Sequence, residues 1–261
     1  MPELPDLHVY SINLKKMILG RTITSVRICN PRKFDTPDIF RQTLTGTNIR
    51  DIVREGKELH FLLANNNSFG VHLMLSGKFF IANENDDGPI SGKILALDFE
   101  DHQSFVIADY QGLCKVSLNP KAGKAPDALS EQFTFDYFTR MIHKNALKNI
   151  KAVLIDQNAV RGIGNAYVDE ILWKADISPE SVSGKIPETK IKDLYEAISF
   201  TLHDAIQNIL KIAPDIINGE ERSFLRVHNP RKKCTDNGDK IIKKTIATKT
   251  TYFTDRQQLY I

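Results

Sequence analysis

The sequence predicts an α+β protein of two domains: an N-terminal β-sandwich with flanking helices, then a C-terminal helical domain that ends in a β-hairpin. Short runs of β-branched and aromatic residues, separated by Gly, Asn or Asp, fill the chain up to about residue 120. A segment rich in Pro, Gly and Lys follows at 119–126, and beyond it apolar residues recur at helical spacing. We therefore expect domains at 1–120, 131–220 and 221–261, with a linker at 121–130.

The N-terminal elements follow from local patterns. Apolar residues on one side of the first segment predict a helix over 4–18. Strands are expected at 22–28, 59–63, 69–73, 78–81, 94–99 and 104–108. Several short strands at this spacing are typical of a sandwich or barrel. An acidic cluster at 84–87 is expected to face away from any nucleic acid.

In the second half of the chain, the spacing of apolar residues changes from that of strands to that of helices. Apolar residues three and four apart predict helices over 133–142, 147–156, 165–175 and 189–212. In the last 40 or so residues the pattern alternates again, which predicts a two-stranded hairpin.

The composition excludes several classes of protein. Hydrophobic residues make up 41% and charged residues 26%, which is ordinary for a globular chain and not for a disordered or fibrous one. No apolar run approaches the roughly 18 residues of a membrane span, and the first residues show no secretory signal. Three widely spaced cysteines predict no disulfide framework. A cytoplasmic location is expected, at the nucleoid if the source is bacterial.

Positive charge is concentrated near the C-terminal end. Residues 222–249 contain nine basic and two acidic residues, although the net charge of the whole chain is only +3. Such a local excess is typical of a surface that binds a polyanion. A solvated basic tail is the alternative interpretation.

A glycine-rich corner precedes the helix expected at 165–175. Gly162 and Gly164 let the backbone approach a ligand, and the helix start offers N–H groups and a positive dipole. This predicts a site for a DNA phosphate, with Asn165 as the N-cap or as an amide donor to the phosphate. The alternative is an ordinary helix-turn-helix corner.

Four motifs in this order cover nearly the whole chain: MPELPD, REGKELHF, HLMLSGKF and LIDQNAVRGIGNAYVDEIL. Together they resemble the formamidopyrimidine-DNA glycosylase / endonuclease VIII family. The resemblance implies a helix–two-turn–helix domain and a base-excision repair DNA glycosylase with AP lyase activity. Such an enzyme removes oxidised or ring-opened bases, such as formamidopyrimidine or 8-oxoguanine, through a Schiff base on its N-terminal proline, and then eliminates the strand. The implied partner is damaged DNA, bound by a monomer without a cofactor or a membrane.

The first two residues after Met1 have suitable chemistry. Met1 precedes a small residue and should be removed, which leaves Pro2 as a free secondary amine. An α-amino group has a pKa of about 8, so a usable fraction is neutral and can attack a sugar carbon. Glu3 can protonate the ring oxygen and shuttle protons during elimination. The family assigns these roles to its Pro and Glu; without the resemblance, a frayed terminus would be the simpler interpretation.

The resemblance implies further roles. Lys57 is expected to contact phosphate and the reacting sugar, although an exposed turn lysine is the alternative. Glu170 matches a carboxylate near the active site, or it supports the N-terminus. Asn165 and Lys249 are expected to grip phosphate. Lys249 aligns with an arginine of the family, so it keeps the charge but loses the bidentate fork.

The finger departs from the family, which usually has four zinc-binding cysteines there. Cys234 is the one cysteine at these positions, and the other three align with Asn237, Thr254 and Gln257. Thr and Gln with one thiolate do not form a stable tetrahedral zinc site. We therefore expect no metal, and a finger held by the packing of Ile241, Ile246, Tyr252 and Phe253.

The residues that would fill the gap left by a flipped base also differ. The family commonly uses Met, Arg and Phe, and the corresponding positions here are Leu75, Gln111 and Leu113. Leucine can wedge into a base stack, and glutamine can hydrogen-bond the orphaned base. Leu75 as a core residue and Gln111 as a turn residue are the alternatives. For the substrate, the motifs MPELPD and HLMLSG favour oxidised purines. The three changed wedge residues and the short loop at 214–233 do not favour them.

Two other functions stay open from the sequence. A family member could bind lesions or abasic sites without excising bases, as the changed wedge and finger suggest. A helix-turn-helix regulator could use residues 147–175 to bind an undamaged DNA sequence.

Overall fold

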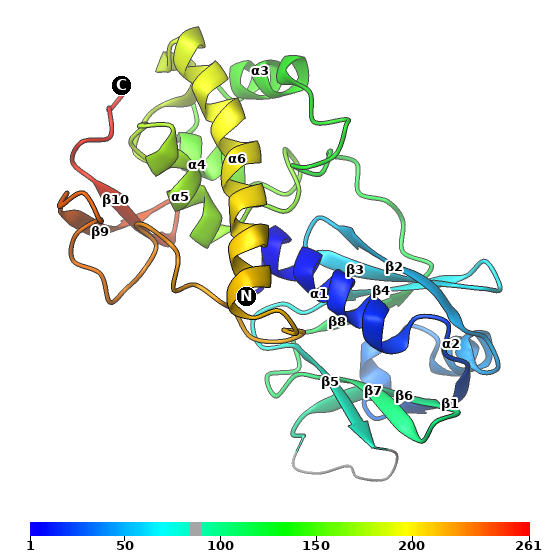
Figure 1. Ribbon diagram of the computed structural model, residues 1–261. Helices are drawn as coiled ribbons and strands as arrows, with labels where there is room; N and C mark the ends of the chain where they lie inside the picture. Colours follow the sequence, from blue (N-terminus) through cyan, green and yellow to red (C-terminus); the bar gives the residue numbers. More distant parts are fainter. Residues whose placement is uncertain (84–89) are drawn as a thin grey trace. The chain divides into compact units, whose positions relative to one another are not determined.

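The computed structural model describes residues 1–83 and 90–261 (Figure 1). The acidic cluster at 84–87 lies outside the described residues. The chain divides into two compact units. Unit 1 comprises residues 1–2, 6–122 and 210–220, and unit 2 comprises residues 3–5, 123–209 and 221–261.

Unit 1 contains two antiparallel four-stranded sheets in the part of the chain that is described. The first has the order β1-β6-β7-β5 and the second the order β2-β3-β4-β8. The strands of the first are β1 (Ile23–Ile28), β5 (Lys78–Asn83), β6 (Lys93–Phe99) and β7 (Gln103–Ala108). Those of the second are β2 (Ile49–Glu55), β3 (Glu58–Leu63), β4 (Ser68–His72) and β8 (Lys115–Leu118).

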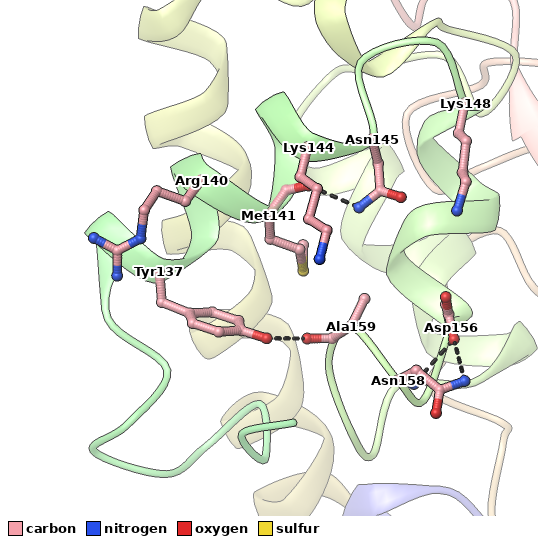
Figure 2. Close-up of a pocket in the computed structure, with 9 residues that line it drawn as sticks. All are labelled: Tyr137, Arg140, Met141, Lys144, Asn145, Lys148, Asp156, Asn158 and Ala159. Carbon is pink, nitrogen blue, oxygen red and sulfur yellow. Dashed lines mark hydrogen bonds between the residues drawn. The ribbon is translucent and has the colours of Figure 1, made fainter. Parts of the chain in front are cut away.

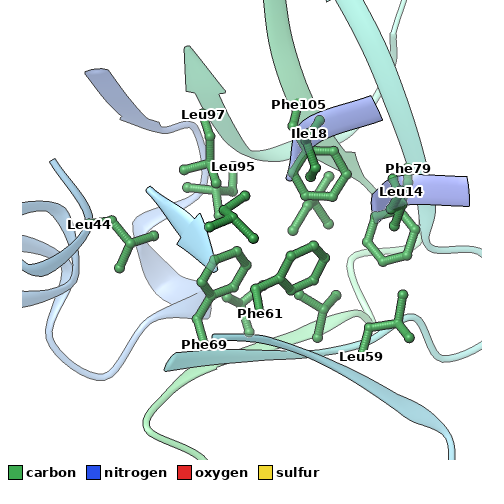
Figure 3. Packing of buried hydrophobic residues seen from close by; sticks show 14 of the residues in the cluster. Leu14, Ile18, Leu44, Leu59, Phe61, Phe69, Phe79, Leu95, Leu97 and Phe105 are labelled. Atoms are coloured by element: carbon green, nitrogen blue, oxygen red, sulfur yellow. The ribbon is translucent and has the colours of Figure 1, made fainter. Parts of the chain in front are cut away.

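Aromatic side chains join the facing sides of the two sheets (Figure 3). The ring of Phe61 on β3 lies 6.2 Å from that of Phe79 on β5 and 5.4 Å from that of Phe105 on β7. Helix α1 (Leu4–Ile18) adds Tyr10, whose ring meets Phe79 edge-on at 6.5 Å. All four rings are fully buried, so the predicted sandwich with a flanking helix is confirmed.

Three elements of unit 1 have weak sequence signals and were not predicted. Strand β2 has a register shift between Ile49 and Asp51, which breaks its alternation of apolar and polar residues. Strand β8 has four residues, too few to show a period. Helix α2 (Pro37–Leu44) has eight residues and buries two of them, Phe40 and Leu44. A short 3-10 helix at Pro31–Lys33 was not predicted either.

Unit 2 contains the helices and the hairpin that the sequence predicts. They are α3 (Phe135–Lys144), α4 (Ile150–Ile155), α5 (Asn165–Lys174), α6 (Glu188–Ile212, of which residues up to 209 belong to unit 2), β9 (Ile241–Ile246) and β10 (Lys249–Thr254). A 3-10 turn lies at Ser183–Lys185. Two starts have side-chain caps, because Thr134 accepts from the N–H of Tyr137 and Asn149 from that of Ala152. Within the described ranges, no helix has the length and apolar character to cross a membrane.

Candidate active site

Glu3 lies at the N-terminus of helix α5 in unit 2. Its side chain is buried, with 3% exposed, and its two carboxylate oxygens accept hydrogen bonds from the backbone N–H groups of Ala166 at 2.9 Å and Tyr167 at 3.3 Å. These N–H groups have no partner inside the helix, and the positive end of the helix dipole favours a negative charge there. The anion bound at the glycine corner is therefore the carboxylate of Glu3. Pro2 and Glu3 are both buried, so the frayed-terminus interpretation is wrong.

The two glycines of the corner leave room for this N-terminal segment. A Cβ on Gly164 would lie 2.3 Å from Cδ of Glu3, and one on Gly162 would lie 2.5 Å from Cδ1 of Leu4. Gly162 also has φ +102°, a conformation that other residues rarely adopt. The N–H of Leu4 donates to the carbonyl of Gly162 at 3.2 Å. The corner therefore holds residues 3 and 4 by direct contact.

Asn165 is not the N-cap of α5, which corrects one of the two roles expected for it. The N-cap is Gly164, and Asn165 is the first helical residue, because the carboxylate of Glu3 binds the N–H groups that a capping side chain would bind. The Nδ2 of Asn165 donates to the carbonyl of Thr250 at 2.8 Å. This hydrogen bond brings the first turn of α5 next to Lys249, the exposed first residue of β10.

Gln157 shapes the same corner, and the sequence analysis missed it. Its side-chain amide donates to the carbonyls of Ile155 at 2.9 Å and Ile163 at 2.8 Å, and its oxygen accepts from the N–H of Gly162 at 3.0 Å. One side chain thus satisfies three backbone groups of the turn between α4 and α5. A glutamine in a turn has no distinctive spacing, so only the structure identifies this role.

A buried ion pair connects α4, α5 and the hairpin. The amine of Lys151, which is fully buried, lies 2.7 Å from Oδ1 of Asp169 and donates to Oγ1 of Thr251 at 2.6 Å. Oδ2 of Asp169 accepts from the N–H of Tyr252 at 2.9 Å and lies 2.7 Å from Nδ1 of His228. Burial lowers the pKa of Lys151, and the charge of Asp169 opposes this. The network sets the register of β10 against α5.

Glu170, the carboxylate that the resemblance singles out, holds the segment before the hairpin. Its oxygens accept from the N–H groups of Arg226 at 2.9 Å, Val227 at 2.8 Å and His228 at 2.7 Å. Burial raises the pKa of Glu170, while these three donors favour its charged form. The carboxylate therefore organises residues 226–228.

The four residues at the positions where the family usually binds zinc are either exposed or buried with hydrogen bonds of their own. Cys234 and Asn237 are exposed, whereas Thr254 and Gln257 are buried. The amide of Gln257 donates to the carbonyl of Ile177 at 2.8 Å, and its oxygen accepts from the N–H of Thr254 at 2.8 Å. Hydrogen bonds from Gln257 thus connect the end of β10 to the segment after α5. Of the residues expected to pack the finger, Ile246, Tyr252 and Phe253 are buried and Ile241 is half-buried.

Removing metal ions should not destabilise the finger. We expect EDTA to leave the melting temperature unchanged, because no group of three or more His, Cys, Asp or Glu side chains among the described residues could hold a metal ion. Gln257→Ala should lower the free energy of unfolding by about 1–3 kcal/mol, since it leaves buried backbone groups unpaired. Gln258→Ala is the matched control, because that side chain is exposed. A stoichiometric metal that EDTA removes with a loss of stability would contradict the prediction.

Unit 1 contains the other predicted site residues. Lys57 follows Gly56 in the tight turn between β2 and β3, and it is half-buried, so it is not a fully exposed lysine. Leu75 is 61% exposed, which excludes the alternative of a core residue. Leu113 is 41% exposed, and Gln111 accepts a hydrogen bond from Ser76 at 3.2 Å.

A cavity of about 350 Å³ lies elsewhere in unit 2, beside α3 and the turn after α4 (Figure 2). The hydroxyl of Tyr137 donates to the carbonyl of Ala159 at 2.7 Å and joins two of its walls. Arg140, Lys144 and Lys148 outnumber the one acidic residue of the lining, Asp156, so the lining has a net positive charge. The lining contains none of the residues that the sequence predicts for the site, so this cavity is a separate feature.

Comparisons with known proteins agree with this geometry. The model of the formamidopyrimidine-DNA glycosylase N-terminal domain matches residues 1–116, and that of the formamidopyrimidine-DNA glycosylase H2TH domain matches residues 124–213. The formamidopyrimidine-DNA glycosylase of Enterococcus faecalis is 31% identical over 97% of this chain and 95% of its own length. That of Lactococcus lactis is 32% identical over 97% of each chain.

Solved structures show the same fold. The Lactococcus lactis enzyme non-covalently bound to DNA containing an AP site is 27% identical, with a TM-score of 0.86 over 98% of this chain and 99% of that one. A mutant of it in complex with DNA containing Fapy-dG is 28% identical, with a TM-score of 0.86 over the same shares. The matched length, the identity and the common fold lead to one conclusion: this chain belongs to the formamidopyrimidine-DNA glycosylase family.

Proposed function

We propose that this protein is a base-excision repair DNA glycosylase with AP lyase activity that removes oxidised or ring-opened bases. Its relatives are named formamidopyrimidine-DNA glycosylases, and similar structures contain DNA with an abasic site, Fapy-dG or an oxidised pyrimidine. The proposal includes action as a monomer on damaged DNA, in the cytoplasm and at the nucleoid if the source is bacterial.

The position of Glu3 is the observation that supports the proposal most. Its carboxylate is held at the start of α5, and Pro2 is bonded directly to it. A nucleophile and an acid/base group that are neighbours in the chain are thus anchored together. Once Met1 is removed, the secondary amine of Pro2 is attached to this anchored residue.

The proposed reaction uses these two groups in sequence. The neutral nitrogen of Pro2 attacks C1′ of the damaged nucleotide, and the glycosidic bond breaks as the base leaves and takes a proton from water. The carboxylate of Glu3 accepts the proton that the Pro2 nitrogen loses and passes it to the ring oxygen, which opens the sugar and leaves an iminium between Pro2 and C1′. The carboxylate of Glu3 then takes a proton from C2′ as the 3′ phosphate leaves, and water releases Pro2 from the sugar remnant.

Three residues are proposed to hold the DNA backbone. The Nδ2 of Asn165 carries two hydrogens, and Thr250 binds one of them, so the second can reach a phosphate oxygen. Lys249, next to Thr250, supplies a positive charge beside this amide. Lys57 is proposed to contact the phosphate and the reacting sugar. Since lysine is a point charge rather than a fork, we expect phosphate holding at Lys249 to be weaker than with arginine.

A panel of damaged duplexes tests the proposal and its alternatives. The duplexes contain 8-oxoguanine, formamidopyrimidine, thymine glycol, hydantoin or an abasic site, and each is incubated with and without borohydride. We expect base release and strand cleavage on at least one lesion, and a covalent adduct with borohydride. Tight lesion binding without an adduct would instead support a lesion-binding protein. A preference for one undamaged sequence would support a regulator.

A further inference from the structure

The cavity beside α3 is lined by three cations that have no partner of their own. Arg140 and Lys144 belong to α3, and Lys148 lies between α3 and α4. Among the described residues, none of these three side chains makes a hydrogen bond or an ion pair. The amine of Lys144 extends toward the space between Tyr137 and Asp156 (Figure 2). The positive charge of the lining is therefore available to an anion.

A fixed aromatic ring forms one wall of the cavity. The hydroxyl of Tyr137 donates to the carbonyl of Ala159 at 2.7 Å, and the centroid of its ring lies 6.2 Å from that of Phe133. Met141, which is 6% exposed, lines the cavity as well. Planar bases of any kind stack on such rings, because every base has a π-face. This wall therefore suits a ligand with a planar body.

The lining also contains open hydrogen-bond acceptors. Oδ1 of Asp156 accepts from the backbone N–H and the side-chain amide of Asn158, at 2.9 and 3.2 Å, whereas its Oδ2 has no partner in the described part of the chain. The amide nitrogen of Asn145 donates to the carbonyl of Met141 at 2.9 Å, which leaves the side-chain oxygen open. A ligand with N–H donors as well as an anionic group would satisfy both sets of partners.

The cavity has the size of a small-molecule site and its walls are already in place. Its volume of about 350 Å³ is at the small end of the range of about 300–1,000 Å³ for such sites, and a phosphate ion alone would fill only part of it. The turn after α4 is closed by backbone hydrogen bonds from Ala159 and Val160 to the carbonyl of Asp156, at 2.8 and 3.0 Å. Binding therefore requires little ordering of the protein.

We infer that this cavity binds a nucleoside 5′-monophosphate, with the phosphate held by the cations of the lining and the base against Tyr137. A phosphate monoester has a charge of about −1.5 to −2 at neutral pH. This charge matches three cations and one carboxylate better than the single charge of a phosphodiester does. The same chemical unit occurs as a free nucleotide and at the 5′-phosphorylated end of a DNA strand. The inference goes beyond the proposed function and does not require base excision.

Methionine methyl groups can locate the ligand. The full chain with 13C-labelled methionine methyl groups is titrated with dGMP, whose base carries several N–H donors. Met141 lines the cavity, whereas Met17 and Met74 belong to unit 1. We expect the NMR signal of Met141 to shift with saturation and those of Met17 and Met74 to stay in place. Deoxyguanosine and inorganic phosphate, which each carry one part of the ligand, should bind at least about tenfold more weakly.

Substitutions in the lining test each part of the site. Lys144→Gln and Lys148→Gln should each lower the affinity for dGMP about tenfold, because a charged hydrogen bond is lost. Both lysines are exposed, so these variants should fold. Lys192→Gln is the matched control, since Lys192 is an exposed lysine of α6 outside the lining, and its affinity should change less than about twofold. Tyr137→Leu should weaken dGMP about tenfold but leave the binding of inorganic phosphate nearly unchanged.

Competition with short DNA strands distinguishes the two sources of the ligand. Displacement of dGMP by a strand with a 5′-phosphate, but not by the same strand with a 5′-hydroxyl, identifies a strand end as the ligand. No displacement by either strand identifies a free nucleotide. The inference is overturned if millimolar dGMP leaves the signal of Met141 in place, or if Lys144→Gln and Lys148→Gln bind dGMP as Lys192→Gln does. Binding of dGMP by a protein that excises no base would contradict the proposed function and not this inference.

Discussion

Insertion of one alanine between Met1 and Pro2 should abolish both strand cleavage at abasic sites and adduct formation with borohydride. The extra residue converts the amine of Pro2 into an amide, whose nitrogen cannot attack a sugar carbon. We expect cleavage to fall by at least about a thousandfold, as expected when a covalent nucleophile is lost. DNA affinity should change little, because Asn165 and Lys249 keep their places.

The matched control adds the same alanine after Ile261, which is 80% exposed. This variant should cleave abasic DNA like the unmodified chain. Mass spectrometry of each protein establishes which residue comes first, so that retained Met1 is not mistaken for an inactive Pro2. An adduct that forms at the normal rate in the inserted variant would show that Pro2 is not the nucleophile.

Gly164→Ala should remove most of the excision activity although it adds only a methyl group. The new Cβ would lie 2.3 Å from Cδ of Glu3, far closer than real Cβ contacts, so the carboxylate must leave its position on α5. Gly164 has φ −127°, which any residue can adopt, so the effect is steric and not backbone strain. We expect at least about a 100-fold loss of excision, as displacement of a catalytic group by 1 Å can cause.

Gly20→Ala separates this effect from a loss of stability. Gly20 has φ +78° and nothing within 4 Å of an added Cβ, so its replacement costs about 1–2 kcal/mol through the backbone alone. Gly164→Ala should be destabilised by a similar amount, about 1–3 kcal/mol from overpacking. Excision rates measured well below both melting temperatures should be normal for Gly20→Ala. A normal rate in Gly164→Ala as well would contradict the proposed role of Glu3 at this position.

The helices show what local patterns can and cannot predict. The apolar periods of α1 and α6 span four or more turns, so their ends agree with the structure to within a residue. Helix α2 was missed because eight residues with two buried side chains carry too little periodicity. Strand β2 was missed because the register shift between Ile49 and Asp51 breaks its alternation of apolar and polar residues.

At the site, the sequence indicated which residues matter but not which residues they contact. The glycines at 162 and 164 indicated an anion site at a helix start, and the sequence offered a DNA phosphate as the anion. The structure places Glu3 there, 163 residues away along the chain from Ala166. The role of Gln157 at the glycine corner was not recognised at all, because a single polar residue in a turn has no period and no motif.

The sequence by itself determined the two-domain α+β architecture, the order of most elements and the family, since periodicity and motifs are properties of neighbouring residues. Only the tertiary structure decided which distant groups meet, such as Lys151 with Thr251 or Ser76 with Asp109. The physical reason is that a hydrogen bond or an ion pair depends on distances of a few ångströms in space. Those distances are set by how the elements pack and not by their spacing along the chain.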